Sequence, residues 1–373
     1  MNHHRDRKAQ SRRLALKTLL GTTALAMASP ATLRAQEEIQ SLYVDDDVDR
    51  AVKKGIRYLV STAKKSGAIA DRGHEVAMTS LAIMAMASIG IEPGVTDADS
   101  LAMSSAIDFV LTKRHQDSKG YFGNADGSRM YGHGIITLML TEMLGMGSSP
   151  EQNKRIHDAL EKAVKLILAA QAVKKSKTLA GGWRYTPTAR DSDLSVSVWQ
   201  LMAMRSAKND GLDVPAAAID LAIAYLKYSY TVPRSRRGNT DNEIGGFSYT
   251  PGHHHPSFTM TSAGLLAMQV CGQYESPMVK GAAEWLLQNP PKTNERFFHY
   301  GVYYYAQGMH QAGGKYAELA DKLVPEMLLS QQRGNGSWEA RGGEERNQGA
   351  VYATAMSILS LSVRYHYLPI YQR

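Results

Sequence analysis

The sequence is poor in cysteine, and its single cysteine, Cys271, excludes an internal disulfide and any zinc site built from several thiolates. The surrounding stretch, LLAMQVCG, favours a small buried side chain over a reactive nucleophile. A collagen-like or disordered composition is also absent, because 43% of the residues are hydrophobic and 21% are charged. The 373 residues suffice for one large domain or two ordinary ones.

A long apolar run is missing near the N-terminus, where the stretch 14–28 is too short for a typical membrane-spanning helix. It follows Arg12 and Arg13 and leads into small residues, so we predict an export signal over residues 1–35. Residues 11–17, SRRLALK, resemble the twin-arginine export motif, with Ala15 where that motif usually has Phe. An ordinary secretory signal and a retained membrane anchor stay open, and we expect an exported protein, either periplasmic or secreted.

Strong basic charge is confined to that segment. Residues 1–35 hold seven basic residues and one acidic residue, so without them the formal charge of +8 falls to +2. A remainder so close to neutral gives no reason to expect a nucleic-acid partner.

What the sequence does contain is an internal repeat. The block from Gly181 to Ala207 returns after 64 residues as a second block from Gly245, and both keep the Gly-Gly and Tyr-Thr-Pro elements in register. Asp191 and Asp193 of the first block correspond to His255 and Ser257 of the second. Because the frame is kept while the polar positions change, we expect the frame to be scaffold and the polar positions to carry any chemistry.

Two kinds of helical segment alternate along the chain after a linker over residues 36–45. One kind is amphipathic, with charges on one side, and is expected at 48–64, 100–113, 153–171, 215–228, 277–288 and 315–331. The other kind is apolar or small nearly all round, and is expected at 74–89, 133–144, 193–207, 258–271, 300–311 and 348–365. A helix without a polar face must be covered on every side.

This alternation predicts an all-α fold, an (α/α)6 toroid of six helical hairpins over residues 46–373. The apolar helices form a parallel inner ring and the amphipathic helices form an outer ring. With strict out-and-back alternation, the six inner N-termini gather at one rim, where we expect unpaired N–H groups and partial positive charge.

The residues at these positions carry a resemblance. The pattern Gln332…Gly336-Ser337-Trp338 and the block GGWRY…DSDLSVSVWQLMAM resemble the prenyltransferase and squalene-cyclase repeats of the terpenoid cyclase/protein prenyltransferase superfamily. The resemblance covers about residues 46–365. It implies the toroid fold and a cavity for a hydrophobic, isoprenoid-like ligand, although relatives of this fold include catalytic and non-catalytic proteins.

Within this resemblance, Asp191-Ser192-Asp193-Leu194 is similar to the Asp-x-Asp-Asp motif of class II terpene cyclases, whose third residue donates a proton. The resemblance assigns that role to Asp193 and implies that Asp191, as a like-charged neighbour, raises the pKa of its carboxyl. Leu194 replaces the last Asp of the motif. If the protein is an enzyme, it would be an acid-initiated isomerase or lyase. The alternative is that Asp193 or Asp191 caps the helix that follows, a role for which Asp is a preferred residue.

The prenyltransferase type of site requires zinc held by Asp, Cys and His, and the block around Asp193 has no Cys. Consecutive histidines at 253–255 point in different directions, so we predict no metal and no cofactor. Residues expected to bind a ligand are those aromatic and histidine side chains that the repeat places at or near the rim: Trp183, Tyr185, Tyr249, Phe258, His133, His255, His299 and Tyr303.

Two functions from different classes follow. The first is an exported protein that binds or cyclises a hydrophobic isoprenoid-like molecule in the toroid cavity. The second is a non-catalytic toroid that serves as a binding or scaffold module, with the rim residues as caps and partner contacts. Membrane association through the N-terminal segment and the oligomeric state stay open.

Overall fold

The computed structural model describes residues 45–232 and 244–371, and a compact unit begins at Asp47. The predicted export signal and most of the linker lie outside the described residues. Within the described residues, no helix has both the length and the apolar character that a bilayer crossing needs.

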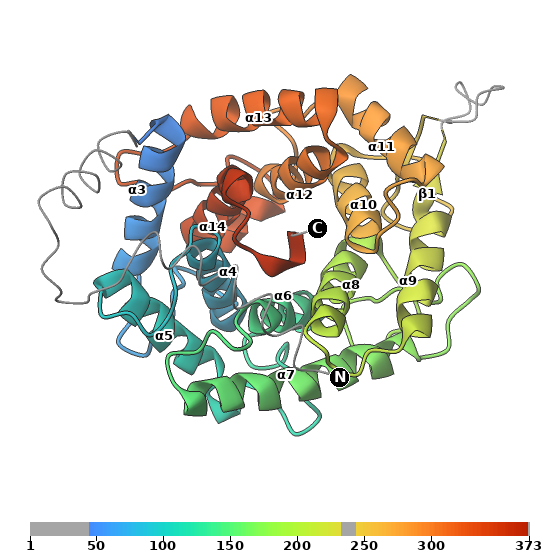
Figure 1. Cartoon of the computed structure of the whole chain (residues 1–373). Helices are drawn as coiled ribbons and strands as arrows, with labels where there is room; N and C mark the ends of the chain where they lie inside the picture. Colours follow the sequence, from blue (N-terminus) through green and yellow to red (C-terminus); the bar gives the residue numbers. More distant parts are fainter. Residues whose placement is uncertain (1–44, 233–243, 372–373) are drawn as a thin grey trace, which may run out of the picture. The chain divides into compact units, whose positions relative to one another are not determined.

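Two concentric rings of helices form the fold, as predicted (Figure 1). The outer helices are α3 (Asp47–Ser61), α5 (Ala98–Val110), α7 (Pro150–Gln171), α9 (Ala216–Ser229), α11 (Pro277–Gln288) and α13 (Gly314–Leu329). The inner helices are α4 (Glu75–Ala87), α6 (Arg129–Glu142), α8 (Leu194–Asn209), α10 (Phe258–Val270), α12 (Phe298–Ala312) and α14 (Gly349–Leu361). The (α/α)6 toroid is thereby confirmed.

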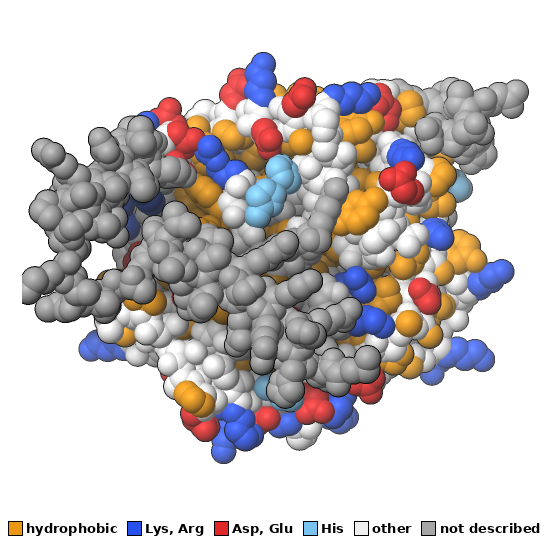
Figure 2. Space-filling view, viewed as in Figure 1, with side chains coloured by type: hydrophobic (Ala, Val, Ile, Leu, Met, Phe, Trp, Pro, Cys, Tyr) orange, Lys and Arg blue, Asp and Glu red, His pale blue; other side chains and the backbone are white. Residues whose placement is uncertain are grey.

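Each inner helix packs against the inner helices before and after it, and α14 packs against α4, so the ring is closed. The inner helices are buried on nearly all sides: every residue of α10 and of α14 is buried. Outer helices bury one side and leave the other in water, as α7 shows with its charged residues on the outside. In the view of Figure 2, acidic and basic side chains are interspersed around the perimeter.

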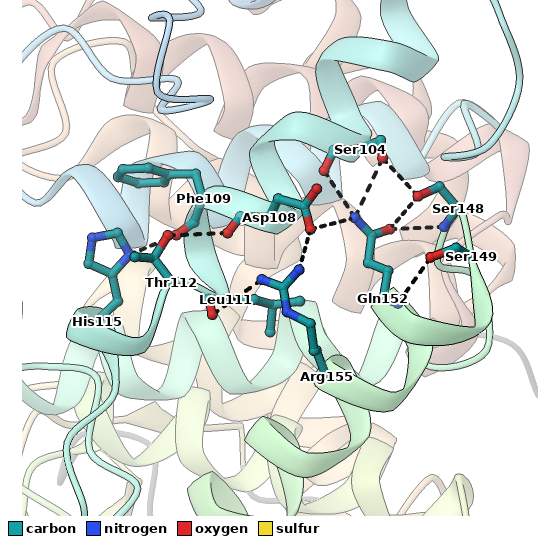
Figure 3. Close-up of polar contacts among 10 residues, drawn as sticks. All are labelled: Ser104, Asp108, Phe109, Leu111, Thr112, His115, Ser148, Ser149, Gln152 and Arg155. Carbon is teal, nitrogen blue, oxygen red and sulfur yellow. Dashed lines mark hydrogen bonds and ion pairs between the residues drawn. The ribbon is translucent and has the colours of Figure 1, made fainter.

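Polar side chains tie neighbouring outer helices together (Figure 3). Gln152 and Arg155 on α7 both donate to Oδ1 of Asp108 on α5, at 3.0 and 2.7 Å. The Gln152 amide also donates to the backbone carbonyl of Ser104 at 3.2 Å. These bonds connect two successive outer helices directly.

The glycine-rich loops before the inner helices follow one plan. In the third hairpin, Trp183 is buried and its indole N–H donates to the carbonyl of Ile167 at 2.9 Å. The Gln171 amide donates to Gly181 at 3.1 Å and to Ala218 of the next outer helix at 2.9 Å. In the last hairpin, Trp338 and Gln332 make equivalent bonds. The recurrent Gln, Gly and Trp therefore connect successive hairpins through hydrogen bonds.

A short sheet and the C-terminal segment complete the fold. Strand β1 (Tyr230–Thr231) pairs antiparallel with β2 (Gly246–Phe247), with Tyr230 opposite Phe247. The last turns, η4 (Ser362–Tyr365) and η5 (Pro369–Tyr371), cross the centre of the ring (Figure 1).

The C-terminal segment closes the ring at the end where the inner helices finish. His366 lies against His310, near the end of α12, and Tyr367 packs on Gly90, just beyond α4. The hydroxyl of Tyr371 is hydrogen-bonded to that of Tyr303 on α12. The opposite end, where the inner helices begin, is the end left for a cavity.

Candidate functional site

A cavity of about 810 Å³ lies among the beginnings of the inner helices. All six inner helices, or the residues just before them, contribute to its wall. The inner N-termini therefore meet at one rim, as the alternation of helices predicted, and together they form this site.

The wall becomes less polar with depth. On α4, His74 stands just before the first turn, whereas Met78 and Leu81 lie further along the same face. A rise of 1.5 Å per residue puts Leu81 roughly 9 Å below the start of the helix. On α6, Arg129 begins the helix and Ile135 lies almost two turns deeper. The mouth is thus polar and charged, while the interior is apolar.

Aromatic rings make up a large part of the wall: Tyr131, Tyr185, Trp199, Tyr249, Tyr300 and Tyr352. The ring of Trp199 stacks on Tyr303, with 5.9 Å between centroids and 8° between planes. Because Tyr303 is in turn bonded to Tyr371, this stack separates the cavity from the C-terminal segment. Trp199 therefore forms part of the floor.

The start of each inner helix is supplied with hydrogen-bond acceptors, which corrects the expected rim of unpaired N–H groups. Asp126 accepts from two N–H groups of α4, at 2.9 and 3.0 Å. Glu345 does the same for α12, at 3.2 and 2.9 Å. Asp71 does so for α14, at 2.7 and 3.3 Å.

The remaining three inner helices are capped by other means. The carbonyls of Tyr185 and Tyr249 accept from the first turns of α6 and α8, at 3.1 and 2.8 Å. Ser257 caps α10 through its hydroxyl at 3.3 Å. The acceptors offset part of the positive charge at the N-terminal ends of these helices.

Asp193 is a helix cap, in agreement with the alternative that the sequence left open. Its Oδ1 accepts from the Val196 N–H at 2.9 Å and from the Ser195 hydroxyl at 2.6 Å. Nε of Arg184 lies 3.2 Å from Oδ2. The side chain is 0% exposed and does not line the cavity, and burial raises the pKa of its carboxyl.

Asp191, expected to raise the pKa of the Asp193 carboxyl, has an exposed side chain, 3.5 Å from Arg184. It does not line the cavity either. The guanidinium of Arg184 therefore separates the two carboxylates, which the spacing in the sequence had brought together as one acid pair.

Two of the predicted ligand-binding aromatics, Tyr185 and Tyr249, line the cavity, and their hydroxyls are hydrogen-bonded at 2.5 Å. Trp183, Phe258 and Tyr303 do not line it. Each is buried against neighbouring structure: Trp183 fastens the loop, Phe258 packs on Tyr305, and Tyr303 lies beneath Trp199. Their expected place on the wall is corrected, because each ring is turned toward a neighbouring element.

The three predicted histidines also lie away from the cavity wall. His133 and His299 are buried within the helix layers, where desolvation lowers the pKa of each imidazole to about 4. His133 faces the carbonyl of Ala163 and His299 faces the hydroxyl of Ser357, both at 3.1 Å. His255 lies on an exposed loop. Among the described residues, no group of three or more potential ligands is arranged to hold a metal ion.

Charged residues at the mouth were not among the predicted site residues. They are Glu295, Glu344, Glu345, Arg129 and Arg296. Arg296 donates to Glu344 at 2.6 Å, and burial raises the pKa of Glu295 and of Glu345. Their position in the sequence could have predicted their place at the mouth, because each lies at the start of an inner helix or a few residues before it.

Comparisons with known proteins find likeness in structure only. No family model matches the sequence, and no curated protein matches it. The α-1,6-mannanase GH76A of Salegentibacter sp. HEL1_6, in complex with α-1,6-mannotriose, superimposes with a TM-score of 0.57 at 10% identity, over 86% of this chain and 100% of that chain. The GH76 α-mannanase BT2949 of Bacteroides thetaiotaomicron gives 0.54 at 10% identity, over 86% and 96%.

A type II terpene cyclase, MstE from Scytonema, in complex with geranylgeranyl dihydroxybenzoate, gives a TM-score of 0.49 at 16% identity, over 86% of this chain and 98% of that chain. Identities this low show a shared fold and no more. By fold this chain is similar to the (α/α)6 toroids, and its activity has to be inferred from its own cavity.

Proposed function

We propose that this protein binds a small molecule with an apolar body and one polar end in the central cavity. The observation that carries the proposal is the gradient of the wall, from charged residues at the mouth to Met78, Leu81 and Ile135 inside. A cavity of about 810 Å³ falls within the range of small-molecule sites, about 300–1,000 Å³. Burial of apolar ligand surface would contribute about 25 cal/mol for each Å² removed from water.

The interior favours an apolar guest over a saccharide. The mannanase in the comparison holds a mannotriose, whose hydroxyls each need a hydrogen-bond partner. Met78, Leu81 and Ile135 offer none, and a sugar hydroxyl left without a partner there would cost about 1–3 kcal/mol. The body of the ligand is therefore hydrocarbon-like, which agrees with the isoprenoid-like ligand expected from the sequence.

Binding is proposed here in preference to acid-initiated cyclisation. The assigned proton donor, Asp193, is engaged as a cap and does not line the cavity. A non-catalytic scaffold would need no cavity of this size. From the pattern of residues 1–35 we further propose that the protein is exported and meets its ligand outside the cytoplasm.

The test is to purify the full-length protein and identify bound small molecules by native mass spectrometry and by solvent extraction. Tryptophan emission, to which Trp199 in the cavity wall contributes together with three other tryptophans, should change when dodecan-1-ol is added. Ile135→Trp would fill the interior and should remove the extracted ligand, as measured by mass spectrometry. Leu101→Trp, on the exposed side of α5, is the matched control and should retain it. A wild-type protein that neither carries nor takes up an apolar molecule would refute the proposal.

A further inference from the structure

We infer that the polar end of the ligand is a hydrogen-bond donor, a hydroxyl or an ammonium group, and not an anion such as a phosphate. This inference rests on the proposed function and identifies the chemistry that the mouth of the same cavity recognises. It depends on where the protons of the cavity-lining hydroxyls are directed.

The hydroxyls beside α8 donate their protons to groups of the protein. The Ser195 proton is committed to Asp193, whose Oδ1 is 2.6 Å away. The hydroxyl of Tyr131 is hydrogen-bonded to the Ser195 oxygen and, because that serine already donates, Tyr131 must be the donor. Tyr300 donates to the Ser195 carbonyl at 2.9 Å. The protons of Tyr131 and Tyr300 thus point into the protein. The Tyr300 oxygen also accepts from the Tyr304 hydroxyl at 3.5 Å, so the oxygen of Tyr131 is the one left for a ligand beside α8.

The other cavity-lining tyrosines are hydrogen-bonded within the protein as well. The Tyr352 hydroxyl donates to Oε1 of Glu345 at 3.1 Å, so this proton is committed as well. Tyr185 and Tyr249 share a hydrogen bond, which commits one of their two protons. Among the five cavity-lining tyrosines, four of the phenolic protons are therefore used within the protein.

The groups that usually bind an anion are already engaged at the mouth of this cavity or are exposed to water. Helix N-termini bind phosphate through free N–H groups, but the leading N–H groups of α4, α12 and α14 already donate to Asp126, Glu345 and Asp71. Of the two arginines at the mouth, Arg296 pairs with Glu344 at 2.6 Å. Arg129 is exposed, where water screens its charge.

The charges and rings that face the cavity favour a donor. Three glutamates lie at the mouth against two arginines, so the formal charge there is negative. The faces of aromatic rings are negative and attract cations. A ligand hydroxyl would donate a hydrogen bond to a phenolic oxygen. An ammonium group would in addition pair with Glu295, for which no ion pair within 4.0 Å is found among the described residues. A phosphate would find the phenolic oxygens and the glutamates opposite its own oxygens, with the exposed Arg129 and the indole N–H of Trp199 as opposing donors.

The test uses three ligands that share one dodecyl chain: dodecan-1-ol, dodecylamine and dodecyl phosphate, each titrated into the full-length protein below its micellar concentration and followed by tryptophan emission and calorimetry. We expect the alcohol and the amine to bind with a Kd at least about tenfold lower than that of the phosphate. Glu295→Gln should weaken the amine and leave the alcohol unchanged, which separates the two kinds of donor.

Tyr131→Phe should weaken the alcohol about two- to tenfold, as expected for one lost hydrogen bond. Tyr316→Phe, on outer helix α13 with its hydroxyl on Glu284, is the matched control and should change nothing. Unfolding midpoints in urea would show that each variant is folded.

The outcomes distinguish the two proposals. Equal or tighter binding of dodecyl phosphate would overturn the inference while leaving the proposed apolar site intact. If none of the three ligands binds, the proposed function fails and the inference fails with it.

Discussion

Acidification should destabilise this protein through two buried histidines, His133 on α6 and His299 on α12. Both rings are held neutral inside the helix layers, and burial lowers the pKa of each from 6.5 to about 4. In the unfolded chain the same rings take up a proton near pH 6.5. The unfolded state therefore binds more protons between pH 6.5 and pH 4, and stability falls as the pH is lowered through 6.5.

The size of the effect follows from these values. At pH 5 the unfolded histidine is almost fully protonated and the buried histidine is almost neutral. Each ring then lowers the free energy of unfolding by about 2 kcal/mol relative to pH 8. The two together remove about 4 kcal/mol, which is a large part of the roughly 5–15 kcal/mol that stabilises a typical domain.

Urea unfolding at pH values from 8 to 5 measures this dependence directly. His133→Gln should lower stability at pH 8, because it removes the hydrogen bond from the imidazole to the Ala163 carbonyl. Between pH 8 and pH 5 it should lose about 2 kcal/mol less than the wild type. His254→Gln, on the exposed loop, is the control and should keep the wild-type slope. An unchanged slope in His133→Gln would show that this ring titrates normally and would refute the reasoning.

Two further substitutions test the frame of the site. Asp193→Asn should lose less stability than Asp193→Ala at pH 7, because its amide oxygen can still cap α8, although Arg184 loses the carboxylate oxygen that it faces. Asp193→Ala should lose about 3 kcal/mol with its cap and buried partners. Equal stability of wild type and both variants in urea would argue against a capping role. Gly181→Ala should cost several kcal/mol in thermal and urea unfolding, because φ is +93° and the new Cβ would lie 2.1 Å from the Leu221 carbonyl. Gly211→Ala, at φ +90° with open space around it, should cost only about 1 kcal/mol, and a similar loss at both positions would contradict the clash.

Local pattern was sufficient to predict the helices and their two rings. A segment such as Phe258–Val270, apolar all round, has to be covered on every side, and helical periodicity depends only on neighbouring residues. Six such segments alternating with amphipathic ones leave few arrangements other than a closed double ring. Even the capping alternative for Asp193 could be stated from sequence, since a cap acts within one turn of its own helix.

Contacts between hairpins decided the rest. Asp126 and Glu345 precede α6 and α14 in the sequence but cap α4 and α12, because ring closure brings each loop against the previous inner helix. Whether a ring faces the cavity depends on the rotation of its helix against both neighbours: Tyr300 reaches the cavity while Tyr303, one turn further along α12, lies beneath Trp199. Sequence patterning therefore determined a ring of inner helices with a common mouth, whereas only tertiary packing determined which acceptors cap each inner helix, because those partners come from loops that are distant in the chain.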